Sequence, residues 1–107
     1  MGPEIDVLES ALQEFTGANH AIACGSGTDA LLLALMSSGV GPGDAVFTTP
    51  YTFFATAEVI SLVGATPVFV DVDPITYNLN PECLSASIKQ TLSADELTPK
   101  GIIAAIL

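Results

Sequence analysis

The sequence contains no arginine and no tryptophan, and its two lysines, Lys89 and Lys100, stand against twelve acidic residues. The formal charge of −10 excludes a nucleic-acid-binding surface and disfavours an anionic membrane, because both need clustered positive charge. An anionic ligand would therefore find few cationic side chains here. Such a ligand has to be held by backbone dipoles or by another part of the protein.

Cysteine, histidine and long apolar runs are also scarce. Cys24 and Cys83 have neither CxxC nor Cys/His spacing, which argues against a disulfide framework or a metal site, and we expect both thiols to be buried. His20 is expected to be a packing or surface residue. No apolar run reaches the roughly 20 residues of a bilayer span, and no signal-peptide pattern follows Met1, which favours the cytoplasm and no membrane partner.

Apolar material, in contrast, is abundant. Of the 107 residues, 50% are hydrophobic and 13% are charged, and the mean hydropathy is +0.58. A chain this short has more apolar surface than it can bury alone. Its last residues, Ile106 and Leu107, fall inside a predicted strand instead of a polar tail. We therefore expect residues 1–107 to be the N-terminal portion of a larger domain.

Short apolar segments alternate with helical patterns along the chain. Helices are predicted at residues 3–15, 29–38, 54–63 and 81–90. Strands are predicted at residues 20–24, 45–49, 66–70 and 102–107, with extended chain at 76–79. Asn80 is the expected N-cap of the last helix. Continuous apolar strands that alternate with helices indicate a mostly parallel sheet covered on both faces, so the predicted fold class is three-layer α/β/α.

The most informative segment joins the predicted strand 20–24 to the following helix. Gly25 and Gly27 allow close approach of the backbone, and Thr28 supplies a hydroxyl where free N–H groups and the positive end of the helix dipole converge. This arrangement can bind a phosphate without lysine or arginine. Glycine-rich turns also serve as plain connections, and the spacing matches neither GxxxxGK[ST] nor GxGxxG, so both interpretations stay open.

Two further clusters follow the next two strands. Residues 48–56 are rich in hydroxyls and aromatic rings at the carboxyl end of a strand, where α/β sheets bind ligands. Phe53 and Phe54 there could cover a planar ring or pack into the core, and at least one is expected in the core. Asp71 and Asp73 could form a carboxylate pair or shape a turn around Pro74, and we favour the turn.

An ordered set of motifs spans the chain. In sequence order they are Gly2-Pro3-Glu4, Ser26-Gly27-Thr28-Asp29-Ala30-Leu31, Gly41-Pro42-Gly43-Asp44, Thr49-Pro50, Thr52-Phe53, Ala55-Thr56-Ala57-Glu58, Gly64-Ala65-Thr66-Pro67-Val68 and Asp71-Val72-Asp73-Pro74. Together they resemble the DegT/DnrJ/EryC1/StrS aminotransferases over essentially the whole chain. No single motif is decisive, but the ordered set is highly specific.

The resemblance implies the aspartate-aminotransferase fold, fold type I, whose large domain binds pyridoxal 5′-phosphate. It implies that Ser26, Gly27 and Thr28 hold the cofactor phosphate and that Phe53 stacks on the pyridine ring. It also implies a homodimer that transfers an amino group, commonly from glutamate, to a keto-sugar nucleotide. Residues 99–103 are similar to family members involved in surface-polysaccharide synthesis.

The chemistry of this family needs two groups that the sequence does not supply. A Schiff-base lysine must hold the cofactor and move protons, and an acid must keep its ring nitrogen protonated, and in the family both lie downstream of the matched region. Lys89 and Lys100 do not match the family's lysine motif, and Asp71 and Asp73 occupy a different position. No catalytic and no metal-binding residue is therefore assigned.

Three interpretations follow from this absence. The preferred one is an aminotransferase fragment that is inactive alone. The second is a fragment of a sugar-nucleotide dehydratase of the same family, in which a histidine replaces the lysine. The third is a non-catalytic α/β module that associates with itself through exposed core surface.

Overall fold

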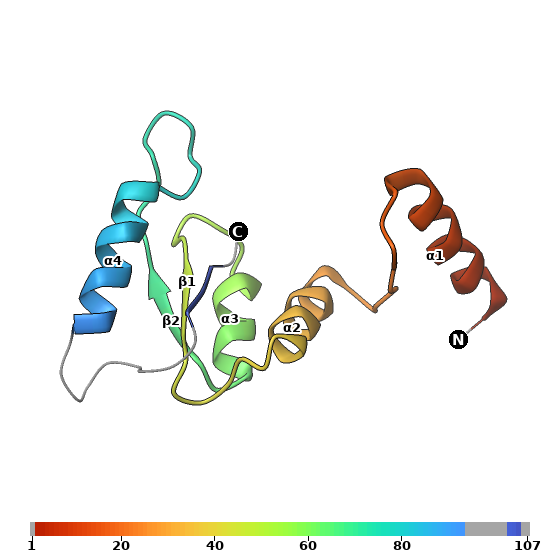
Figure 1. The fold of residues 1–107 in the computed structure, drawn as a ribbon, viewed down its shortest axis with the longest axis horizontal. Coiled ribbons are helices and arrows are strands. Elements are labelled where there is room, and N and C mark those ends of the chain that lie inside the picture. Colours follow the sequence, from red (N-terminus) through yellow and green to blue (C-terminus); the bar gives the residue numbers. More distant parts are fainter. Residues whose placement is uncertain (1, 94–102, 106–107) are drawn as a thin grey trace.

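The structure, a computed structural model, describes residues 2–93 and 103–105 (Figure 1). In chain order the elements are α1 (Pro3–Thr16), α2 (Gly27–Ser37), β1 (Ala45–Thr48), α3 (Ala55–Leu62), β2 (Thr66–Phe69), α4 (Pro81–Ser93) and β3 (Ile103–Ala105). Within these described ranges, no helix combines the length and the apolar character that crossing a bilayer requires.

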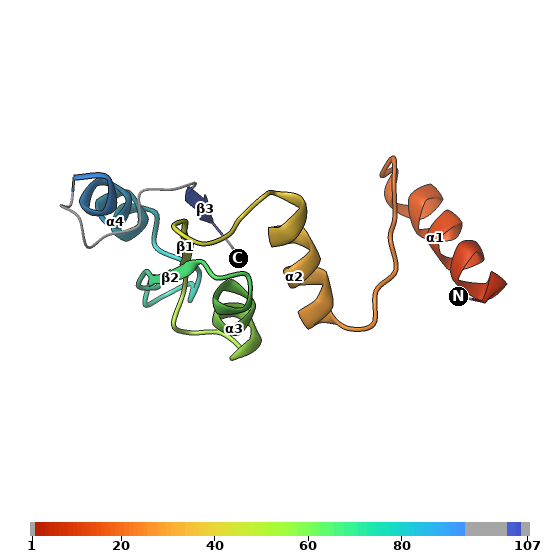
Figure 2. The ribbon, with the colours of Figure 1, turned by 90° about the horizontal axis from the view of Figure 1, so that it is seen from below.

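Strand β1 is the centre of a parallel sheet with the order β2-β1-β3. Its first residue, Ala45, pairs with Thr66 on one side and with Ile103 on the other. Helix α3, backed by α2, covers one face of the sheet, and α4 lies on the other face (Figures 1 and 2). All of β1 is buried because it has a neighbour at both edges and a helix on both faces. The predicted three-layer α/β fold is therefore confirmed.

The core forms where α2 and α3 meet the sheet. Val46 of β1 and Val59 and Ile60 of α3 are fully buried, and Leu35 of α2 packs into the same cluster. Burial of an aliphatic side chain of this size contributes roughly 1.5–3 kcal/mol. These contacts hold α2 against α3, which itself lies on the sheet.

Helix α1 stands apart from this body (Figures 1 and 2). It has no buried residue, and Phe15 on its last turn is 88% exposed. Gly17 ends the helix in the left-handed conformation, and the chain then folds back so that Glu9 Oε1 accepts the N–H of Ala23 at 2.6 Å. The radius of gyration is 16.4 Å, whereas a compact domain of this size has roughly 13 Å. The chain is thus extended at its N-terminal side.

The predicted strand at residues 20–24 is wrong. This segment has no regular secondary structure, and its Ile22 is 83% exposed. A strand needs a neighbour for its N–H and C=O groups, and none of the described strands lies beside this segment. Cys24 is consequently exposed and not buried as expected, whereas Cys83 is partly buried.

Smaller differences concern the C-terminal half. The extended chain predicted at residues 76–79 is largely absent: Thr76 ends a turn that begins at residue 74, and Leu79 alone forms an antiparallel bridge, to Val72. Asn80 caps α4 as predicted, because its Oδ1 accepts the N–H groups of Glu82 and Cys83 at 2.8 and 3.1 Å. The predicted strand 102–107 is described only as β3, and the rest of it lies outside the described residues.

Two turn glycines, Gly64 between α3 and β2 and Gly43 before β1, allow a prediction about stability. Both Gly64 and Gly43 have positive φ angles, 81° and 92°, but only at Gly64 would a Cβ meet another residue, 2.9 Å from Cγ of Pro42. Both alanine substitutions incur the left-handed backbone cost of roughly 1–2 kcal/mol. Gly64→Ala is expected to lower the unfolding free energy by about 1 kcal/mol more than Gly43→Ala, because of the added overlap. Urea unfolding of both variants measures the difference, and equal losses would contradict it.

Candidate functional site

The loop before α2 has the form of an anion cradle. Ser26 is the N-cap: its Oγ accepts the N–H of Asp29 at 3.1 Å and its carbonyl accepts the N–H of Ala30 at 3.0 Å. The amides of Gly27 and Thr28, which precede them in the first turn, take part in none of the hydrogen bonds of the described residues. Two free donors therefore lie at the positive end of the α2 dipole.

The glycines of this loop have different roles. A Cβ on Gly27 would meet nothing within 4 Å, so open space lies beside the free amides. A Cβ on Gly25 would lie 2.7 Å from Oδ2 of Asp29, so that position has no room for a side chain unless Asp29 moves. Open space also lies beside Gly17, Gly39 and Gly43, so open space alone does not mark a phosphate site. A phosphate needs such space next to free amides, and the residues present therefore fit the phosphate group that the sequence resemblance implies.

The second part of the site is the loop between β1 and α3. Phe53 is 77% exposed and Phe54 is similarly exposed, so the expectation that at least one of them packs into the core is wrong. The reason is that the buried face of α3 begins only at Ala55, while both phenylalanines precede it at the open end of the sheet. The ring of Phe53 is thus exposed at this edge instead of filling the core.

A neighbouring loop packs against this one through two rings. The ring centroids of Tyr51 and Tyr77 lie 5.7 Å apart at an interplanar angle of 33°, a tilted arrangement at a separation typical of aromatic pairs. Tyr77 is the one non-glycine residue of the described chain with a positive φ, 59°. Such strain persists only where surrounding contacts impose it. The contact ties residues 71–80 to the loop that carries Phe53.

Asp73 shapes that neighbouring loop. Its Oδ1 accepts the N–H groups of Thr76 and Ile75 at 2.8 and 2.9 Å and the hydroxyl of Thr76 at 3.1 Å. These backbone donors, Thr76 first, hold the pKa of Asp73 below its usual value. Asp71 accepts the N–H of Val72 instead. The preferred interpretation of the two acids as turn formers is confirmed for Asp73, and they do not form a carboxylate pair.

The fold brings the two parts of the site to one edge. Helices α2 and α3 pack side by side, and both begin at the end of the body where β1 and β2 finish (Figure 1). Ser26, Gly27 and Thr28 open α2, and Phe53 immediately precedes α3. The carboxyl edge of a parallel sheet is where α/β proteins bind ligands. The predicted phosphate residues and the predicted stacking residue thus share this edge.

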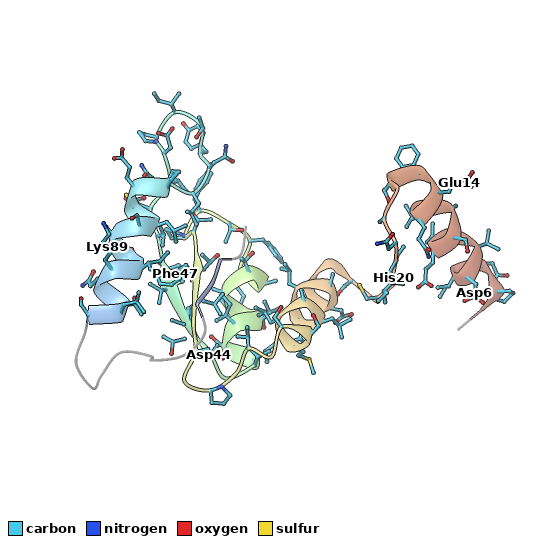
Figure 3. The ribbon with its side chains drawn as sticks, in the orientation of Figure 1. Asp6, Glu14, His20, Asp44, Phe47 and Lys89 are labelled. Atoms are coloured by element: carbon cyan, nitrogen blue, oxygen red, sulfur yellow. The ribbon has the colours of Figure 1, made fainter. Side chains whose placement is uncertain are left out.

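The ionisable residues of uncertain role lie elsewhere. His20 follows α1, away from the sheet, and Lys89 lies on α4, on the face of the sheet opposite α2 and α3 (Figures 1 and 3). Lys100 lies outside the described residues. Lys89 is the one lysine or arginine in residues 2–93 and 103–105, so the cradle has to rely on backbone N–H groups.

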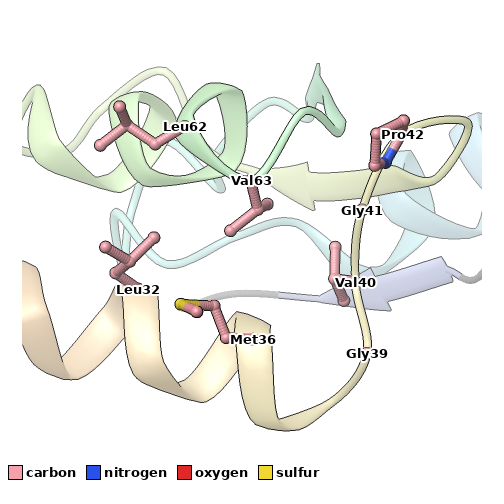
Figure 4. A pocket seen from close by; sticks show the side chains of 8 residues that line it. All are labelled: Leu32, Met36, Gly39, Val40, Gly41, Pro42, Leu62 and Val63. Atoms are coloured by element: carbon pink, nitrogen blue, oxygen red, sulfur yellow. The ribbon is translucent and has the colours of Figure 1, made fainter.

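A separate hollow lies between the C-terminal ends of α2 and α3 (Figure 4). Its volume is about 560 Å³, and its walls are apolar, with Leu32 and Met36 on one side and Leu62 and Val63 on the other. It lies at the ends of the helices opposite the cradle. Its apolar lining cannot bind a phosphate, so it is no part of the candidate site.

The sequence interpretation missed two residues that shape the site, Thr56 and Tyr77. Thr56 contacts the loop of Phe53, and a signal for it existed in the spacing Thr52 to Thr56, which places the two hydroxyls one helical turn apart. For Tyr77 there was no signal, because neither its positive φ nor its ring contact leaves a pattern in the sequence.

The chain belongs to the DegT/DnrJ/EryC1/StrS aminotransferase family, whose model matches residues 1–105. One relative is UDP-2-acetamido-2-deoxy-3-oxo-D-glucuronate aminotransferase of Pseudomonas aeruginosa, 53% identical over 88 residues that cover 82% of this chain and 24% of the relative. The chain thus spans about a quarter of the length of the curated relatives it matches.

Solved structures agree with this assignment. A DegT DnrJ EryC1 StrS aminotransferase from Brucella abortus has a TM-score of 0.88 and 53% identity, covering 98% of this chain and 27% of that one. NtdA from Bacillus subtilis, solved with its cofactor PMP (pyridoxamine 5′-phosphate), has a TM-score of 0.78 and 31% identity over 81% of this chain and 20% of its own. Because the match to the Brucella abortus structure covers 98% of the chain, it includes the extended helix α1.

The lowered pKa of Asp73 predicts a pH-dependent contribution to stability. Because the folded pKa lies below the unfolded value, near 3.8, the carboxylate stabilises the fold fully above that pH and loses its effect as the pH falls through the folded pKa. Asp73→Asn is therefore expected to be less stable than the wild type at neutral pH, with the difference shrinking below pH 3.8. Denaturant unfolding across this range measures it. Asp71→Asn removes the same charge, so an equal pH dependence of stability in both variants would contradict a specific contribution from the hydrogen bonds that Asp73 accepts.

Proposed function

We propose that residues 1–107 are the N-terminal portion of the cofactor-binding large domain of an aminotransferase that uses pyridoxal 5′-phosphate and acts on keto-sugar nucleotides. The observation that carries the proposal is the open space beside Gly27, next to two free amides at a helix N-terminus, on the same sheet edge as an exposed aromatic ring. A flat, phosphorylated, anionic cofactor needs both features.

Each residue has a distinct role in this proposal. Ser26 shapes the loop by capping α2, and the amides of Gly27 and Thr28 donate to the phosphate oxygens. The Thr28 hydroxyl is a further donor at the same turn. Phe53 covers one face of the pyridine ring and keeps water from it. These residues bind and orient the cofactor and perform no proton transfer.

When bound, pyridoxal 5′-phosphate supplies an electron sink for the carbanion formed during amino transfer. The lysine that holds it and the acid that faces its ring nitrogen lie, in this proposal, in the part of the protein beyond these residues. Lys89 is unsuited to either task because it lies on α4, across the sheet from the cradle (Figure 3). The isolated segment is therefore proposed to be inactive.

The proposed substrates follow from the relatives. The Pseudomonas aeruginosa relative is named as an aminotransferase of a 3-oxo sugar nucleotide, which supports a keto-sugar nucleotide as acceptor here. Glutamate is the proposed amino donor and a homodimer the proposed assembly, both from the family resemblance. The resemblance of residues 99–103 supports surface-polysaccharide synthesis as the destination of the product.

The cradle predicts that Gly27→Ala separates binding from stability. Its methyl group would meet no other residue, so unfolding is expected to stay unchanged, but it would take the space beside the amides. In the full-length protein, affinity for pyridoxal 5′-phosphate is expected to fall at least about tenfold, because charge-assisted hydrogen bonds are lost. Gly41→Ala is the matched control, since its Cβ would make only an ordinary contact, 3.8 Å from the Val63 carbonyl oxygen. Equal affinities in both variants would contradict the cradle.

Borohydride reduction of the full-length protein with pyridoxal 5′-phosphate tests the reaction class. We expect a pyridoxyl group on one lysine beyond residue 107 and none on Lys89 or Lys100, as read by peptide mass spectrometry. Cofactor bound without any lysine adduct would support the dehydratase. A protein that binds no cofactor at all would support the non-catalytic module.

A further inference from the structure

Thr56 lies in the first turn of α3 and contacts the loop of Phe53 twice. Its backbone N–H donates to the Phe53 carbonyl oxygen at 3.0 Å. Its Oγ1 lies 3.1 Å from Oγ1 of Thr52. The side chain is 5% exposed and sits on the same buried face of α3 as Val59 and Ile60. One buried residue therefore ties the backbone on both sides of Phe53 to the packed core.

These two contacts of Thr56 matter because the ring of Phe53 has little else to orient it. The ring is mostly exposed, and the described residues offer it no aromatic partner, in contrast to Tyr51. The direction of an exposed ring follows from the backbone that carries it and from its rotamer. We propose that Thr56 is a positioning residue that aims Phe53 at the cofactor ring, an inference that rests on the proposed function.

Of the two contacts, the one made by the Thr56 hydroxyl depends on the side chain at this position. The amide of any residue but proline at position 56 could donate to the Phe53 carbonyl, whereas the bond to Thr52 needs a polar side chain, which here is the hydroxyl. A buried hydroxyl without a partner is unfavourable, so the pairing fixes Thr52 and with it the approach of the chain to Phe53. Thr48 provides a contrast, since it is fully buried and its Oγ1 has no partner among the described residues.

The test uses the full-length protein and measures affinity for pyridoxal 5′-phosphate by absorbance titration, together with the visible circular dichroism band of the bound cofactor. Thr56→Val keeps the shape and removes the hydroxyl, and it is expected to weaken binding about fivefold and to change the dichroism band. Thr56→Ser restores the hydroxyl and is expected to bind within about twofold of the wild type. Thr48 is also buried but its hydroxyl makes no such contact among the described residues, so Thr48→Val should leave both the affinity and the dichroism band unchanged.

Two further variants separate positioning from folding. Thr52→Val removes the same hydroxyl pair from the exposed side and is expected to have the same effect as Thr56→Val, with less risk to the fold. In a Phe53→Ala background, Thr56→Val should cause no further loss of affinity, because there is no ring left to aim. Additive losses, or a dichroism band that Thr56→Val and Thr52→Val leave unchanged, would overturn the inference. A wild-type protein that binds no cofactor would instead overturn the proposed function, so the two failures are distinct.

Discussion

The burial of β1 between two strands and two helix layers is the constraint on which the rest of the structure depends. Its four residues have no access to solvent, so their backbone groups must pair on both edges and their side chains must pack on both faces. Val46 meets this need through Val59 and Ile60 of α3, and these residues in turn contact Leu35 of α2. The packing holds α2 and α3 side by side, and their N-termini therefore reach the carboxyl edge of the sheet together.

The functional edge is a consequence of this packing. The cradle contains no charged donor, and the ring of Phe53 has no anchoring contact of its own in the described chain, so neither part would be a site in isolation. Each is positioned by the helix that follows it. Between their other ends the same helices form a hollow with a mostly apolar lining.

The sequence predicted the elements whose signals are local. Helix and strand periodicity located β1, β2 and the four helices within a few residues, and Asn80 was predicted as a cap because capping depends on one side chain and the next two amides. The segment 20–24 failed because an apolar run becomes a strand only if another strand accepts it. Phe53 and Phe54 were misplaced for a related reason: composition records that a ring is apolar but not where the core ends.

The site was predictable only in part. The glycine loop could be located from its spacing, but that the first two amides of α2 are unused is a three-dimensional fact. The family resemblance supplied roles that no local pattern could. The role of Tyr77 could not be predicted, because its positive φ and its ring contact with Tyr51 involve loops that are far apart in the sequence.

A phosphate cradle made of backbone has a consequence for how such proteins diverge. A site that depends on a lysine or an arginine is lost by one substitution that removes the charge, whereas every residue but proline carries the N–H that this cradle uses. Mutation can damage it mainly by adding atoms at Gly27 or by moving the start of α2. In the proposed function, neighbouring loops such as the one that carries Tyr77 can change, and so adapt the protein to new acceptors, while the backbone that holds the cofactor stays the same.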